Sequence, residues 1–139
     1  MTIAVTPNQS AVAESAALTA LASAHDKAIR TSAPDIARYF QDLVGQKLTA
    51  YMTGVHDPKA VGKWASGQRA PRGESERRLR DAYQIAMLIS LYESDSTVRA
   101  WLVGMNPLLG DRAPATVIAE SDDGAAQALA AAKAFLANG

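Results

Sequence analysis

The 139-residue chain contains no cysteine and has no long apolar run. The absence of cysteine excludes a disulfide framework, a thiolate metal site and a cysteine nucleophile. The first ten residues, MTIAVTPNQS, contain no cationic segment followed by an apolar core, so we expect no secretory signal. The longest apolar run, IAMLISLY at residues 85–92, is too short to span a bilayer. We therefore expect a cytoplasmic protein that does not enter a membrane.

Runs of β-branched residues, which favour strands, are also nearly absent. Alanine, the best helix former, is abundant, with 29 alanines in a chain that is 48% hydrophobic. Because alanine buries little area, the remaining core is modest for one ordinary domain, or for one small domain with an appendage. The composition predicts an all-α protein.

The formal net charge is zero, but the charges are unevenly distributed. Residues 1–46 sum to −1, residues 47–80 sum to +5, and residues 81–139 sum to −4. A basic middle segment followed by an acidic end predicts that one segment faces a polyanion and that the other does not.

Residues 1–31 form an alanine-rich N-terminal segment. A helix is expected over residues 10–30, with a thin apolar stripe of Leu18, Leu21 and Ala28 or Ile29. This helix could cover the core, pair with a second copy of the chain or remain partly disordered, and the sequence leaves these alternatives open.

Residues 32–92 predict a helix-turn-helix domain. Ser32 and Asp35 form a capping pattern for a helix over residues 33–44, and a second helix is expected over residues 46–53. Gly54 ends the second helix, while Asp57 and Pro58 suit the start of a third helix over residues 58–66. Two helices joined by a short glycine-containing turn form a helix-turn-helix when their apolar positions pack together. A long helix over residues 74–92 follows. The expected apolar positions are Ile36, Tyr39, Phe40, Leu43, Leu48, Tyr51, Met52, Val61, Trp64, Leu79, Ala82, Tyr83, Ala86, Ile89 and Tyr92.

The third helix and the loop after it carry the clearest functional pattern. Lys59 and Lys63 are four residues apart and share one helix face, whereas Val61 and Trp64 lie on another face and are assigned to packing. Cations along one side can neutralise several phosphates, and side chains near the start of a recognition helix point at base edges. We predict a DNA-binding surface of Lys59, Ala60, Lys63, Gln68, Arg69, Arg72 and Arg77, continued by Arg78 and Arg80. Solvated lysines that only confer solubility are the alternative.

No pattern in the sequence indicates catalysis or metal binding. His25 and His56 are isolated and lack ligand spacing, and there is no glycine-rich phosphate loop or nucleophile elbow. We therefore expect no catalytic residue, no metal site and no cofactor, and we do not expect an enzyme.

Two segments resemble one known family. The stretch VGKWASGQRAP, residues 61–71, resembles the end of the recognition helix and the following loop of Xre-type helix-turn-helix regulators. The tail resembles the C-terminal module of the MbcA/ParS/Xre antitoxins through Trp101, the NPLLG turn at residues 106–110, Arg112 with Pro114, and an acidic-glycine step before the last helix. Together the two segments cover roughly residues 33–139 in the family's order.

The resemblance implies a DNA-binding antitoxin of a type II toxin–antitoxin system. Such a protein represses its own operon through the helix-turn-helix and blocks a RES-like toxin through its C-terminal module, here residues 93–139. We also expect a homodimer, since operators read by helix-turn-helix proteins are usually two-fold symmetric. The implied partner contacts are Trp101, Asn106, Pro107, Leu108, Gly110, Arg112, Pro114 and Phe135.

Three alternatives remain open. The final helix could simply complete a helical bundle without contacting a toxin. The chain could be a stand-alone helix-turn-helix transcriptional regulator, of bacterial or phage origin, that has no toxin. It could also be a protein-interaction module that does not bind DNA, although the charge of +5 over residues 47–80 argues against this reading.

Overall fold

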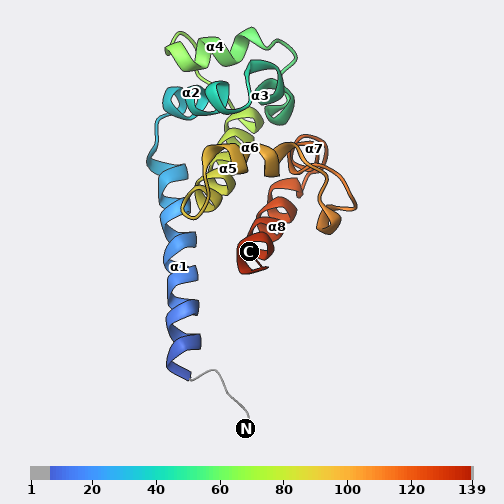
Figure 1. Ribbon diagram of the computed structural model, residues 1–139. Helices are drawn as coiled ribbons and strands as arrows, with labels where there is room; N and C mark the ends of the chain where they lie inside the picture. The colour runs from blue at the N-terminus through green and yellow to red at the C-terminus, as the bar shows by residue number, and fades with distance from the viewer. Residues whose placement is uncertain (1–6, 139) are drawn as a thin grey trace.

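The computed structural model describes the backbone of residues 7–138 and the side chains of residues 11–138. The described residues form helices and no named strand, which confirms the all-α prediction (Figure 1). The elements are α1 (Pro7–Arg30), α2 (Ala33–Leu43), α3 (Gln46–Thr53), α4 (Lys59–Ser66), α5 (Glu74–Ser90), α6 (Asp95–Val103), the short 3-10 helix η1 (Pro107–Leu109), α7 (Pro114–Glu120) and α8 (Gly124–Asn138).

The helices pack around α5, which runs through the middle of the molecule (Figure 1). Helix α1 lies along α5, α2 packs against α4, and α8 contacts both α5 and α7. Helix α3 touches α4, α5 and α7, so it links the middle segment of the chain to its tail. Over residues 7–138, no helix is both long enough and apolar enough to cross a membrane.

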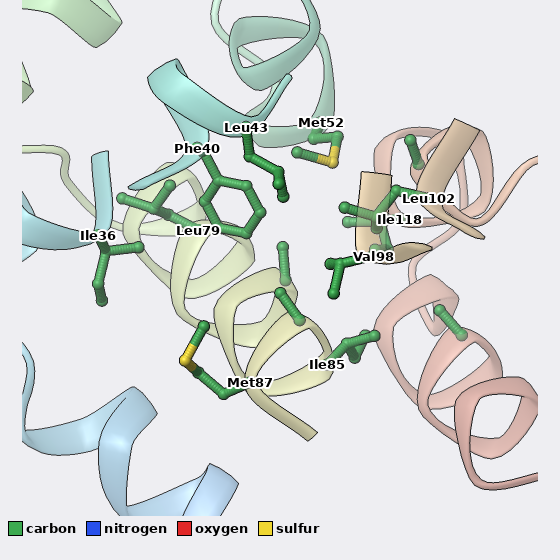
Figure 2. Packing of buried hydrophobic residues seen from close by; sticks show 14 of the residues in the cluster. Ile36, Phe40, Leu43, Met52, Leu79, Ile85, Met87, Val98, Leu102 and Ile118 are labelled. Atoms are coloured by element: carbon green, nitrogen blue, oxygen red, sulfur yellow. The ribbon is translucent and has the colours of Figure 1, made fainter. Parts of the chain in front are cut away.

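One hydrophobic core connects the middle segment with the tail. Phe40 from α2, Met52 from α3 and Leu79 from α5 are buried together with Leu102 from α6 and Ile118 from α7. Figure 2 shows these side chains converging between the helices. Residues 93–138 therefore pack as part of the same body as residues 32–92.

The helix boundaries follow local chemistry. The Ser32 hydroxyl accepts a hydrogen bond from the Asp35 backbone N–H at 3.3 Å, as the capping pattern predicts. Gly54 and Gly67 end α3 and α4 with left-handed φ angles of 80° and 77°, a conformation that glycine adopts without strain. The expected helices over residues 33–44, 58–66 and 74–92 are each slightly too long, and the N-terminal helix begins earlier than expected, at Pro7.

Two tyrosines predicted to be buried are exposed instead. Tyr51 is 41% exposed, because its hydroxyl reaches outward to Glu120, and α3 instead buries Thr49 and Met52. Tyr92 is 57% exposed because α5 ends at Ser90, so the helical periodicity does not extend to it.

The predicted apolar stripe of α1 is only partly correct. Leu21 packs against the core and Ala28 is buried, as predicted, whereas Leu18 and Ile29 are 67% and 63% exposed. The buried side chains are Ala20, Ala24 and Ala28. These alanines lie four residues apart on the face that meets α5, and small side chains allow two helix axes to approach closely. Of the larger residues, Leu18 and Ile29 point elsewhere.

Four arginines fasten helices to one another through backbone carbonyls near helix C-termini. A guanidinium at such a position satisfies an unpaired carbonyl and interacts favourably with the helix dipole. The donor–acceptor pairs are Arg38 to Ala65 (2.8 Å), Arg78 to Ala119 (2.8 Å), Arg80 to Ala28 and Thr31 (2.8 Å each), and Arg99 to Leu43 (2.6 Å).

Candidate nucleic-acid interface and partner surface

Helix α4 has a buried inner face and a cationic outer face. Val61 and Trp64 are buried in the core, as predicted, while Lys59 and Lys63 are exposed on the outer side. The connector from α3 contains Asp57, whose carboxylate accepts a hydrogen bond from the Lys59 backbone N–H at 3.0 Å. This bond fixes the start of α4 and therefore the direction of its outer face.

Ala60, which was predicted to face a base edge, is buried. Its side chain is only 7% exposed because it lies on the same side of α4 as the buried Val61 and Trp64. A methyl group held there is not free to reach a base edge.

Arg78 and Arg80 also point away from the predicted DNA surface. Both guanidinium groups turn inward to the carbonyls described above, so they hold the fold together. Arg77 is exposed but pairs with Glu74, and its hydrogen bonds hold the pKa of the Glu74 carboxyl below its usual value. The cations of α5 are thus engaged within the chain.

The cations of α4 and of the loop after it differ from those on α5. Lys59, Lys63, Arg69 and Arg72 are exposed, and no ion pair involves any of them within the part of the chain that the structure describes. In the sequence, Asp57 is the only acidic residue between positions 47 and 73. The outer face of α4 and the loop after it therefore present positive charge that the described residues do not neutralise.

Arg69 and Arg72 border an open hollow of about 520 Å³ between the α3–α4 connector and the loop after α4. Trp64 and Ala60 supply apolar wall, while His56, Ser75 and the acidic Asp57 add polar groups. Two guanidinium groups around an open hollow can bind an anionic oxygen, such as one of a phosphate group.

The sequence interpretation missed two glutamines beside α4. Gln46, the first residue of α3, donates a hydrogen bond from Nε2 to Oε1 of Gln41 at 2.8 Å. A Cβ atom at Gly62 would lie 2.8 Å from that same Nε2, so the glycine leaves room for the amide pair against α4. Amide side chains can bind phosphates or base edges. Lys47, the next residue, is exposed and was also missed. The sequence signal for the amide pair was the polar Gln46 at the start of a short helix, followed by Gly62 within the next helix.

Five of the predicted partner residues come together in one groove of about 420 Å³. Helices α6 and α8 and the connector between α6 and α7 form it, and Met105, which the sequence interpretation missed, is 82% exposed at its edge. The sequence signal for this residue was its position: a methionine directly before a turn has no helical neighbours to pack against. The predicted residues in the groove are Trp101, Asn106, Pro107, Leu108 and Phe135.

Local hydrogen bonds stabilise the connector that lines this groove. Asn106 Oδ1 accepts a hydrogen bond from the Leu108 backbone N–H at 3.0 Å, and Asn106 also forms an isolated bridge with Arg112. Gly110 takes a left-handed φ of 64° at the end of η1. Leu108 is 65% exposed on this turn, so an apolar side chain is presented on a fixed backbone.

The other predicted partner residues have different environments. Pro114 is buried at the start of α7 and therefore serves the fold, which corrects its assignment as a contact. Arg112 donates a hydrogen bond to Glu120 at 3.3 Å. Trp101 is only 9% exposed, its ring centroid lies 6.5 Å from that of Phe135, and its indole N–H has no hydrogen-bond acceptor among the described residues.

Among the described residues, no group of three or more histidine, aspartate or glutamate side chains could hold a metal ion. Comparison of the chain with family models, with curated proteins and with solved structures gives no match.

Proposed function

We propose that this protein is a DNA-binding antitoxin that represses its own operon through α4 and blocks a RES-like toxin through its C-terminal groove. The observation that carries the DNA-binding part is the set of exposed cations Lys59, Lys63, Arg69 and Arg72, which have no ion pair among the described residues. Their positions on one short helix and its following loop suit contacts with successive phosphates.

The use of cations elsewhere in the chain supports this proposal. Arg77, Arg78 and Arg80 form ion pairs with acidic residues of α5, and Arg78 and Arg80 also bind carbonyls of other helices. Positive charge without an ion pair among the described residues is therefore greatest around α4, in a chain whose net charge is zero. A polyanion is the ligand that this distribution favours.

The rigid connector and its groove support the toxin-blocking part. Leu108 and Met105 expose apolar surface beside the half-buried Phe135, and a fixed backbone loses little entropy on binding. The resemblance of this segment to the toxin-binding module of MbcA/ParS/Xre antitoxins supplies the kind of partner, a RES-domain toxin.

The test compares two exposed helical lysines in a gel-shift titration with the DNA upstream of the protein's own gene. Lys63→Glu on α4 should weaken binding strongly, and Lys59→Glu with Lys63→Glu should abolish it. Lys133→Glu on α8 makes the same charge change at another exposed lysine and should leave affinity nearly unchanged. Equal effects of Lys63→Glu and Lys133→Glu would refute the assignment of α4.

The partner is tested by purification of the tagged protein from its native host. A stoichiometric RES-domain protein that is toxic when expressed alone is the expected result. Recovery of a DNA-binding protein without such a partner would contradict the antitoxin role and would identify a stand-alone regulator.

A further inference from the structure

The N-terminal half of α1 extends away from the rest of the molecule (Figure 1). Every side chain from residue 11 to residue 19 is exposed, and the first buried side chain described is Ala20. Helices shorter than about 12–15 residues are marginal in water without tertiary contacts. This half of α1 would therefore gain stability from a partner.

A regular stripe runs along the face of α1 that does not meet α5. Its members alternate in steps of four and three residues, which is the heptad spacing of a coiled-coil seam. The stripe includes Leu18 and Ile29, two of the large apolar residues that are exposed, at 67% and 63%. The complete stripe, in which every side chain is exposed, is Ala11, Ser15, Leu18, Ala22, His25 and Ile29.

We infer that this stripe pairs with α1 of a second copy of the chain, in antiparallel orientation. With Ala11 of one copy opposite Ile29 of the other, each large side chain meets a small one. Leu18 then packs on Ala22 of the second copy, and His25 packs beside the Ser15 hydroxyl. Alternation of large and small residues fills such a seam, whereas a parallel pair would place alanine against alanine and leave gaps.

The helix dipoles favour the same orientation. An antiparallel pair opposes the two dipoles, whereas a parallel pair aligns them. The charged side chains of α1 lie outside the stripe, and Arg30 forms an ion pair with Asp26 of the same helix. The self-complementary sizes along the stripe identify a second copy as the partner. The pairing does not depend on DNA or toxin binding.

A size swap at one layer of the seam tests the pairing by sedimentation equilibrium. Leu18→Ala should leave a cavity and Ala22→Leu should overfill the layer, so each should weaken the dimer about tenfold or more. The double variant restores one large and one small side chain per layer and should recover most of the affinity. Ala16→Leu, at an exposed position outside the stripe, is the control and should not weaken the dimer. A monomeric wild-type protein at about 100 μM, or a dimer that neither single variant weakens, would overturn the inference.

Disulfide cross-linking tests the orientation, because the natural chain has no cysteine. A chain carrying Ser15→Cys, mixed with a chain carrying His25→Cys, should form a disulfide between the two different chains. Neither variant alone should cross-link, because equivalent residues of an antiparallel pair would be offset by ten residues, about 15 Å. Cross-linking of the Ser15→Cys chain with itself would show parallel pairing and contradict the proposed register. Far-UV circular dichroism of each variant confirms that α1 remains helical.

Discussion

The hydroxyl of Tyr51 on α3 donates a hydrogen bond to the carboxylate of Glu120 at the end of α7. Arg112 lies in the connector between α6 and α7, which lines the groove around Leu108. It donates a hydrogen bond to the other oxygen of the same carboxylate. The helix that precedes the proposed DNA-binding helix is thus joined to the partner connector through one acidic side chain. The hydrogen bond to Glu120 also raises the pKa of Tyr51 above its ordinary value.

Replacement of Gly62 by alanine should separate DNA binding from stability. Alanine favours the helix by about 1 kcal/mol over glycine, so the free energy of unfolding should be unchanged or slightly higher. The new methyl group would displace the Gln46 side chain from Gln41, because the Cβ position lies 2.8 Å from Gln46 Nε2. Urea titration and DNA titration of Gly62→Ala check the two effects. Gln46→Ala should weaken DNA binding similarly, and full affinity in both variants would contradict a role for the amide pair.

Replacement of the neighbouring residues Arg78 and Arg77 by alanine should lower the free energy of unfolding by different amounts. Arg78→Ala removes the hydrogen bond to the Ala119 carbonyl and should lower the free energy of unfolding by about 1–2 kcal/mol. Arg77→Ala removes only an exposed, solvent-screened pair with Glu74 and should lower the free energy of unfolding less than Arg78→Ala does. Urea denaturation measures both variants. A larger loss at Arg77 than at Arg78 would show that the inward arginine does not fasten α5 to α7.

The buried hydroxyl of Tyr39 should limit stability in alkaline solution. Burial raises the pKa of Tyr39 from 10.0 to about 12, and its hydroxyl has no hydrogen-bond partner among the described residues. Since the unfolded chain releases this proton first, the stability present below about pH 10 should be lost progressively towards pH 12. Tyr39→Phe should be neutral or stabilising by up to about 1 kcal/mol at pH 7, and its stability should fall less between pH 10 and 12. Urea titrations of both proteins across this pH range measure the effect. Identical pH profiles of stability would show that Tyr39 does not limit alkaline stability.

Charge placed in the partner groove should prevent toxin binding without unfolding the protein. Leu108→Glu changes an exposed side chain of the groove, so stability should change by less than about 0.5 kcal/mol while affinity for the toxin is lost. Val103→Glu is the matched control, because Val103 is 50% exposed but is not among the residues that line the groove. Calorimetric titration of the two variants with the co-purified toxin measures their affinities. Equal toxin affinities of the Leu108→Glu and Val103→Glu variants would place the interface elsewhere.

The helix boundaries were largely predictable because short-range chemistry determines them. Ser32, Gly54 and Gly67 act within one helical turn, and each ends or begins a helix where the sequence predicts. The interior face of α1 was only partly predictable from hydrophobicity. Leu21 packs against the core as predicted, but the fully buried side chains of α1 are the alanines Ala20, Ala24 and Ala28. Alanine contributes little to an apolar pattern, so the exposed Leu18 and Ile29 were included in the predicted stripe.

The candidate site was predicted only where local helical spacing determines which way a side chain points. Lys59 and Lys63 lie on the outer face of α4 because helical spacing alone separates them from Val61 and Trp64. The inward turn of Arg80 depends on the carbonyls of Ala28 and Thr31, which are about 50 positions away in the chain. Local spacing contains no information about such distant acceptors. The groove around Leu108 likewise depends on α8 packing beside the connector.

The salt dependence of DNA affinity tests the central claim most directly. The logarithm of the association constant for the upstream DNA fragment would be measured against the logarithm of salt concentration. Four phosphate contacts from Lys59, Lys63, Arg69 and Arg72 predict a slope between about −3 and −4 per protomer, reduced by about 1 for each cation replaced with alanine. Absence of binding at low salt, or a slope that these substitutions do not change, would contradict a DNA-binding surface on α4.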